Sequence, residues 1–252
     1  MQTESPASTS PAPPSRLIAP WWHTLLIVLL LLGTSLGGAV TVGRSAHTDL
    51  HHALSYCVTM LWEWVLAALV YWGLRLRRVP LRSVLGAQET GAGAWVKDAG
   101  VALLFWLISL MVLGLCAQLL RPLHVNPDSI RKIVSHLAPT SGLEVVLWIA
   151  MSITAGMVEE FIFRGYLQQQ FGVLTRNAWA GLICSALMFG VAHGYEGLPG
   201  MLLITVYGGL FGVLARIRGN LRPGMMAHAW HDAVSGLALA YFTQHPPHFP
   251  LH

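Results

Sequence analysis

Long apolar runs, each about as long as a membrane-spanning helix, alternate with short polar connections along most of the chain. A helix needs about 20 apolar residues to cross the hydrocarbon core of a bilayer, and several runs reach or approach that length. The pattern predicts an all-α fold, a polytopic transmembrane helical bundle of about seven spans, with six or eight also compatible. The predicted spans are residues 21–42, 54–74, 98–120, 142–164, 178–193, 200–216 and 225–243.

The two ends of the chain differ from this apolar body. Residues 1–20 are rich in Ser, Thr and Pro, a composition that buries too little apolar surface to order a chain. We therefore expect a disordered tail at 1–20 and a second, short tail at 244–252. No long polar stretch separates the spans, so residues 21–243 are predicted to form one bundle. The first apolar run is expected to be an uncleaved span, because its flank lacks the basic region of a signal peptide.

Composition supports the membrane interpretation. Hydrophobic residues make up 54% of the chain, charged residues 10%, and the mean hydropathy is +0.57, whereas soluble domains carry about 25% charged residues. The formal net charge is +4, which raises the question of a nucleic-acid partner. The basic residues lie between apolar runs rather than in one patch, so we expect the lipid bilayer and no nucleic acid.

The basic residues instead predict an orientation, because Lys and Arg concentrate in cytoplasmic connections. Placing the connection at 75–82 in the cytoplasm leaves only Arg44, Arg121, Arg131 and Lys132, of 15 Lys and Arg residues, on the outside. The N-terminus is therefore predicted to be cytoplasmic. With seven spans, the C-terminus would be external.

A few charged residues interrupt the apolar runs. Glu159 and Glu160 are adjacent, and Arg164 follows Glu160 at the i,i+4 spacing at which opposite charges meet on a helix. A charged side chain inside a bilayer costs on the order of 3 kcal/mol, so such residues are expected to be paired or functional. Adjacent helical positions point about 100° apart. We therefore expect Glu160 to pair with Arg164 and Glu159 to be free for chemistry, and we interpret Glu63 and Glu144 as interfacial or paired.

Two further segments place polar residues inside apolar runs. His193 ends the sequence MFGVAH, and His228 and Asp232 lie in MMAHAWHDAV at the i,i+4 spacing of one helical face. His231 lies beside that face and is interpreted as structural. A buried set of His, Glu and Asp residues from three helices can activate water, carry protons or bind a cation. These residues alone leave the three possibilities open.

Three motifs in this order resemble those of the CPBP (Abi) intramembrane protease family, which includes the CAAX prenyl endopeptidases and bacteriocin-processing proteins. EEFIFR fits Glu-Glu-x-x-x-Arg, FGVAH fits Phe-x-x-x-His, and HAWHD fits His-x-x-x-Asn/Asp. The resemblance covers about residues 140–240, where we expect the catalytic core. It implies an intramembrane endopeptidase that cuts a membrane protein or lipidated peptide, and we expect it in the bacterial cytoplasmic (inner) membrane.

The resemblance also implies a role for each matched residue. Glu159 and His193 would activate a water molecule for attack on a peptide carbonyl, and Glu160 and Arg164 would support the site structurally. The prenyl endopeptidases have Asn where this chain has Asp232. Because an ionised Asp cannot donate a hydrogen bond to an oxyanion, we assign that role to His228 and expect Asp232 to orient it.

Zinc is the alternative to a metal-free site, with Glu159, His193, His228 and Asp232 as its ligands. The chain lacks a His-Glu-x-x-His sequence, and we expect no metal. Two other classes of function are possible. An ion-coupled transporter would use the same carboxylates, although the chain shows no internal repeat of the kind typical of transporters. A non-catalytic immunity or scaffold protein would tolerate their loss.

The predicted span limits conflict with this site in one respect. Starting at residue 178 on the cytoplasmic side, His193 falls roughly 22 Å along its helix, toward the outer side of the bilayer. Glu159 and His228 fall nearer the cytoplasmic side. The three side chains can meet only if a span is tilted, ends elsewhere or continues beyond its predicted limit.

Overall fold

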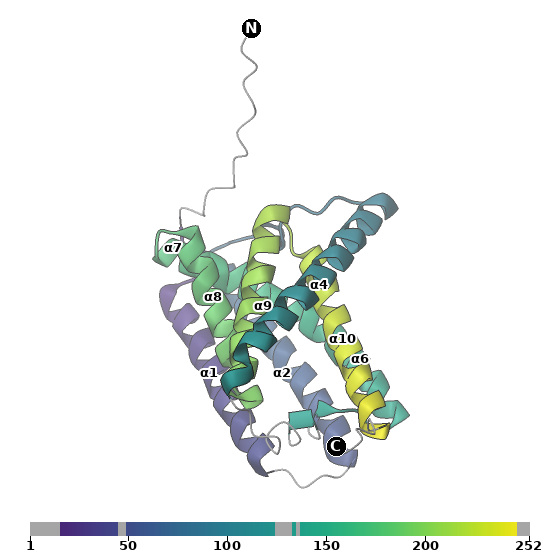
Figure 1. Cartoon of the computed structure of the whole chain (residues 1–252). Coiled ribbons are helices and arrows are strands. Elements are labelled where there is room, and N and C mark those ends of the chain that lie inside the picture. Colours follow the sequence, from purple (N-terminus) through teal and green to yellow (C-terminus); the bar gives the residue numbers. More distant parts are fainter. Residues whose placement is uncertain (1–15, 45–48, 124–132, 135–136, 246–252) are drawn as a thin grey trace.

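The computed structural model describes residues 16–44, 49–123, 133–134 and 137–245, which form a helical bundle without a strand in these ranges (Figure 1). Most helices run along the bundle axis. The elements are α1 (Trp21–Arg44), α2 (Asp49–Leu76), α3 (Leu81–Leu85), α4 (Ala92–Leu120), the 3₁₀-helix η1 (Arg121–Leu123), α6 (Gly142–Glu159), the π-helix η2 (Glu160–Leu167), α7 (Gln168–Leu174), α8 (Ala178–Ala192), the 3₁₀-helix η3 (Gly194–Glu196), α9 (Gly197–Arg218) and α10 (Arg222–Gln244).

Every predicted span falls on a helix, although the ends differ. α8 is apolar but shorter than a typical span, and α10 carries Arg222, Asp232 and several histidines. Large apolar side chains of α4, such as Met111 and Leu119, are exposed, as expected for a surface in contact with lipid. The chain thus has the helices of an integral membrane protein. Within the described residues, five segments are long and apolar enough to cross a bilayer: Trp21–Val40, His52–Leu76, Ala92–Leu120, Gly142–Leu174 and Gly194–Arg218.

The helix that begins at Gly142 continues to Leu174, so its predicted end at 164 is wrong. The polar residues after 164 suggested an earlier end, but the structure buries them against other helices. Gln168 Nε2 donates to the carbonyl of Gly212 at 3.3 Å. Gln170 is fully buried, and a buried amide that has hydrogen-bond partners is compatible with a helix interior.

Gln170 also fixes the segment that precedes α1. Its Oε1 accepts from the backbone N–H of Ile18 at 2.9 Å, and its Nε2 donates to the carbonyl of Ala19 at 3.1 Å. Ile18 and Ala19 are 6% and 0% exposed, which the prediction of a disordered tail at 1–20 did not anticipate. Most of that tail, and residues 246–252 of the other, lie outside the described residues, as do Arg131 and Lys132.

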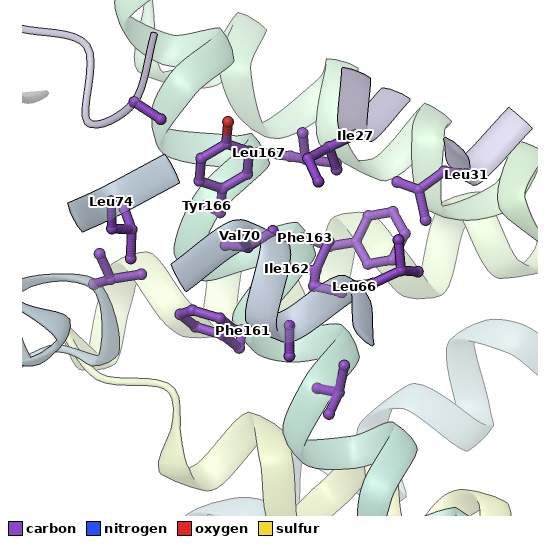
Figure 2. Close-up of a cluster of buried hydrophobic side chains, with 14 of the residues drawn as sticks. Ile27, Leu31, Leu66, Val70, Leu74, Phe161, Ile162, Phe163, Tyr166 and Leu167 are labelled. Carbon is purple, nitrogen blue, oxygen red and sulfur yellow. The ribbon is translucent and has the colours of Figure 1, made fainter. Parts of the chain in front are cut away.

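The main apolar core lies where α1, α2 and η2 meet. The β-branched and aromatic side chains of η2 point toward the faces of α1 and α2 (Figure 2). This contact fixes the orientation of the segment that follows Glu159. The labelled members are Ile27 and Leu31 of α1, Leu66, Val70 and Leu74 of α2, and Phe161, Ile162, Phe163, Tyr166 and Leu167 of η2.

The helix α6 packs between α2 and α10. It runs parallel to α2, because His52 lies 3.8 Å from Glu144 and the Tyr56 ring packs against Trp148 with centroids 5.5 Å apart. It runs antiparallel to α10, where Trp148 Nε1 donates to the carbonyl of Asp232 at 2.8 Å. Both neighbours therefore hold α6 in a defined register.

A Gly156→Ala variant is expected to lose about 1–3 kcal/mol of stability through overpacking. A Cβ atom at position 156 would lie 2.7 Å from Ala229 N and Met225 O of α10, and neither backbone atom moves without separating the two helices. The melting temperature of the purified protein in detergent measures the effect. Gly114→Ala is the matched control, because nothing lies within 4 Å of the corresponding Cβ in α4 and Ala favours a helix. Equal losses in both variants would contradict the close approach of α6 and α10.

Candidate active site

Three helical segments bring the candidate residues together. Glu159 ends α6, His193 follows α8, and His228 and Asp232 lie in α10. His193 Nε2 is 4.0 Å from Glu159 Oε1, and His228 Nε2 is 3.5 Å from Glu159 Oε2. The Glu159 carboxylate thus lies between two imidazole rings. Its side chain is 18% exposed, so it is accessible from outside the core.

The conflict in depth disappears because the helix that carries Glu159 extends to Leu174. The turn that joins α7 to α8 now follows Leu174 rather than residue 164. Glu159 and His193 are equally many residues from this turn, one on each side of it. A helical hairpin with equal arms brings two such residues to the same level.

The predicted ion pair between Glu160 and Arg164 is present and buried. Arg164 Nη1 donates to Glu160 Oε1 at 2.8 Å, and both side chains are 1% exposed. Arg164 Nη2 donates to the carbonyl of Gly208 at 3.1 Å, and the guanidinium lies over the Phe189 ring at 4.3 Å. The pair therefore joins η2 to α8 and α9.

Glu160 has a second contact that the sequence interpretation did not include. Its Oε1 accepts a hydrogen bond from His228 Nδ1 at 3.1 Å. Because Nδ1 donates there, Nε2 is left to face Glu159 and Asp232. Asp232 Oδ2 is 3.6 Å from Nε2, beyond hydrogen-bond distance. Glu160 thus makes the hydrogen bond that orients the His228 ring, a role that the sequence interpretation gave to Asp232.

The His193 ring is oriented by the end of its own helix. Nδ1 donates to the carbonyl of Phe189 at 2.8 Å, so a neutral ring presents Nε2 as an acceptor toward Glu159. The next residue, Gly194, donates its N–H to Ser35 Oγ of α1 at 3.2 Å. The chain after His193 is therefore held against α1.

The π-helix η2 begins at Glu160, directly after Glu159. Hydrogen bonds from residue i to i+5 are rare in proteins and often occur at functional sites. The sequence interpretation assumed a regular α-helix through both glutamates, and no local feature of EFIFRGYL indicated otherwise. The predicted angular relation of Glu160 to the residues after it therefore does not hold, although Arg164 still reaches Glu160.

Several residues near the site were not among the candidates, and two of them are buried polar residues of α2 and α9. Glu63 of α2 is 8% exposed and interacts electrostatically with the carboxyl groups of Glu159 and Asp232. Tyr207 of α9 is 4% exposed, and its hydroxyl has no hydrogen-bond partner among the described residues. The sequence signal for Glu63 is its position on the same helical face as Leu66 and Val70. His231 accepts from Trp106 Nε1 at 3.3 Å, in keeping with a structural role.

The possible zinc ligands do not form a metal-binding group. Among the described residues, no set of three or more His, Cys, Asp or Glu side chains has an arrangement suited to a metal ion. His228 Nδ1 donates a hydrogen bond to Glu160, so only Nε2 of this ring remains available to other partners.

Comparison with known proteins places this geometry in a family. Residues 141–234 match the family model described as type II CAAX prenyl endopeptidase Rce1-like. No curated protein and no solved structure matches the chain. The matched segment extends from the residue before α6 into α10 and contains Glu159, His193 and His228. Residues 141–234 thus resemble the CAAX-type proteases of the CPBP family.

Proposed function

We propose that this protein is a CAAX-type intramembrane endopeptidase, which hydrolyses a peptide bond in a membrane-associated or lipidated protein or peptide. The observation that carries the proposal is the position of the Glu159 carboxylate between His193 and His228, within the segment that matches the family. The Glu159 side chain is partly exposed, as are those of His193 and Asp232, which suits residues that must reach a substrate.

Glu159 and His193 are the water-activating pair in this proposal. Glu159 Oε1 and His193 Nε2 lie 4.0 Å apart, and both are hydrogen-bond acceptors when the ring is neutral. One water molecule donates a hydrogen bond to each. Glu159 takes a proton from this water as general base, and the hydroxide attacks the carbonyl carbon of the substrate peptide bond.

His228 stabilises the oxyanion that forms in this attack. Its Nδ1 is held by Glu160, so the ring presents Nε2 to the reacting carbonyl. The carboxylates of Glu159 and Asp232, at 3.5 and 3.6 Å from Nε2, stabilise the protonated ring, which donates to the oxyanion. A donor positioned in advance at a developing negative charge contributes about 10²- to 10³-fold in rate. Asp232 supports this charge but does not itself donate.

The proposal includes seven spans in the bacterial cytoplasmic membrane, with a cytoplasmic N-terminus. Asp98 near the start of α4 binds both Arg218 at the end of α9 and Arg222 at the start of α10, so these basic residues lie at one end of the bundle. The turn with Arg176 after α7 lies at that same end (Figure 1). Basic residues gathered at one end favour a cytoplasmic position for it.

The proposed function predicts new protein termini that depend on Glu159. Membrane proteins from cells that produce the wild-type chain, and from cells with a Glu159→Gln variant at equal abundance, are to be compared by mass spectrometry of their termini. We expect shortened or newly generated termini only with the wild type. Identical termini in the two samples would favour a non-catalytic membrane protein.

Activity is expected to survive metal removal, because no step in this proposal uses a metal. After prolonged dialysis against a strong chelator, cleavage of a farnesylated CAAX peptide should remain within about twofold of the untreated enzyme. Loss of cleavage that zinc alone restores would contradict the metal-free chemistry and favour Glu159, His193, His228 and Asp232 as ligands.

A further inference from the structure

The helix α2 lies outside the segment that matches the family, yet it is in register with the helix that carries Glu159. The contacts from His52 to Glu144 and from Tyr56 to Trp148 have the same offset along the two helices. The same offset places Glu63 beside Ala155, one turn before Glu159. Because α2 and α6 run parallel, both side chains lean in the same direction, and Glu63 stays about one turn, roughly 5 Å, from the level of Glu159.

Glu63 faces the protein interior rather than lipid. It precedes Leu66 and Val70 by three and seven residues, the spacing of one helical face, and both of these residues belong to the core that includes Val158. Glu63 is 8% exposed, and its Oε2 has no hydrogen-bond partner among the described residues. Its electrostatic interactions are with the carboxyl groups of Glu159 and Asp232.

Two other buried carboxylates of the bundle have hydrogen-bond donors beside them, although Glu144 Oε1, like Glu63 Oε2, has no partner among the described residues. Glu160 accepts from Arg164, and Glu144 Oε2 accepts from the N–H and hydroxyl of Thr140. A buried carboxylate beside two further acidic groups is strongly unfavourable when all are charged. Burial beside these acidic groups therefore favours a protonated Glu63, whose carboxyl then has an O–H donor.

We propose that Glu63 is the general acid of the hydrolysis, an assignment that rests on the proposed endopeptidase function. The resting site has a protonated Glu63 and an ionised Glu159. Glu159 takes a proton from water, and the hydroxide adds to the carbonyl carbon. When the C–N bond of the tetrahedral intermediate breaks, Glu63 gives its proton to the leaving amine. The proton on Glu159 then passes to Glu63, which restores both groups.

The test compares an amide with an ester, because an alkoxide leaves with much less need of a proton than an amine does. The probes are a farnesylated CAAX peptide and its analogue with an ester at the scissile bond, both cleaved by the full chain in detergent. General acid catalysis contributes about 10²- to 10⁴-fold. Glu63→Gln is expected to lower kcat for the amide by roughly 100-fold or more, and for the ester by less than about tenfold.

Glu144→Gln is the matched control, because it also removes a buried carboxylate from the contact between α2 and α6. It should leave the ratio of ester to amide cleavage unchanged. Glu63→Asp keeps a carboxyl group and should retain more amide cleavage than Glu63→Gln. Equal losses of amide and ester cleavage in Glu63→Gln, or no loss of either, would contradict the role of Glu63 as general acid. The proposed endopeptidase function would still stand. Absence of cleavage by the wild type would instead contradict the proposed function, and the role of Glu63 with it.

Discussion

Replacing Glu159 with Gln is expected to lower kcat by roughly 10²- to 10⁴-fold, the contribution of a positioned general base. The amide has nearly the same shape as the carboxylate but cannot take a proton from water. Glu159 lies between His193 and His228 at 4.0 and 3.5 Å, and no hydrogen bond to the backbone depends on its charge. The melting temperature should therefore change little, and KM for a farnesylated CAAX peptide should remain near that of the wild type.

Glu89→Gln is the control for this loss, because the Glu89 side chain is 69% exposed and its charged partner, Lys97, lies on the surface. It should retain full activity. A Glu159→Gln variant that keeps more than about a tenth of the wild-type kcat would contradict the role of Glu159 as the base. A fall in melting temperature that accounts for the lost activity would assign Glu159 a structural role instead.

Replacing Arg164 with Met is expected to give the largest loss of stability, about 3–5 kcal/mol, the typical cost of breaking a buried ion pair. The change removes the guanidinium from the buried Glu160 carboxylate, which keeps only His228 as a donor, and it removes the donor to the Gly208 carbonyl. Chemical denaturation in mixed micelles measures the loss. Arg164 no longer holds Glu160, the residue that accepts the hydrogen bond from His228 Nδ1. The His228 ring is then less well oriented, so activity should fall together with stability.

The double variant Glu160→Gln with Arg164→Met is the informative comparison. It removes the uncompensated charge, while Gln at position 160 still presents an oxygen that accepts from His228 Nδ1. Replacing both members of a buried pair costs much less than removing one, so the double variant should be more stable than Arg164→Met alone. If the double variant is less stable than Arg164→Met, the Glu160–Arg164 ion pair does not account for the loss of stability.

The order of apolar segments was enough to predict an all-helical membrane bundle, but not the end of the central helix. The prediction ended that helix at Arg164, before the polar residues Gln168 and Gln170. In the structure these residues are buried and bonded to neighbouring helices. Hydropathy distinguishes lipid from water, and it does not distinguish water from a polar partner inside the protein.

The motifs predicted which residues meet, but not which atoms bind. The hydrogen bond from His228 to Glu160 depends on the register of α6 against α10, which the spacing within each motif does not contain. The spacing of Glu63 to Leu66 and Val70 indicates that it faces the protein interior. The sequence does not predict that this face lies against the helix that carries Glu159, so Glu63 was not assigned to the site. The π-helix had no sequence signal, because apolar packing on both sides rather than propensity holds it.

The π-helix joins two halves of one long helix that are fixed by different neighbours. Before it, Trp148 and Gly156 are held by α10. In its last turn Tyr166 is bonded to α1, and after it Gln170 is bonded to the residues that precede α1. The neighbours of each half fix its rotation about the helix axis. The wider turns of the π-helix accommodate the difference in rotation between the two halves. Insertions or deletions on either side of the glutamates would therefore alter that relative rotation first. A change before Glu159 or after Arg164 keeps Glu160 and Arg164 four residues apart but rotates the pair relative to His228 of α10 and the Gly208 carbonyl of α9.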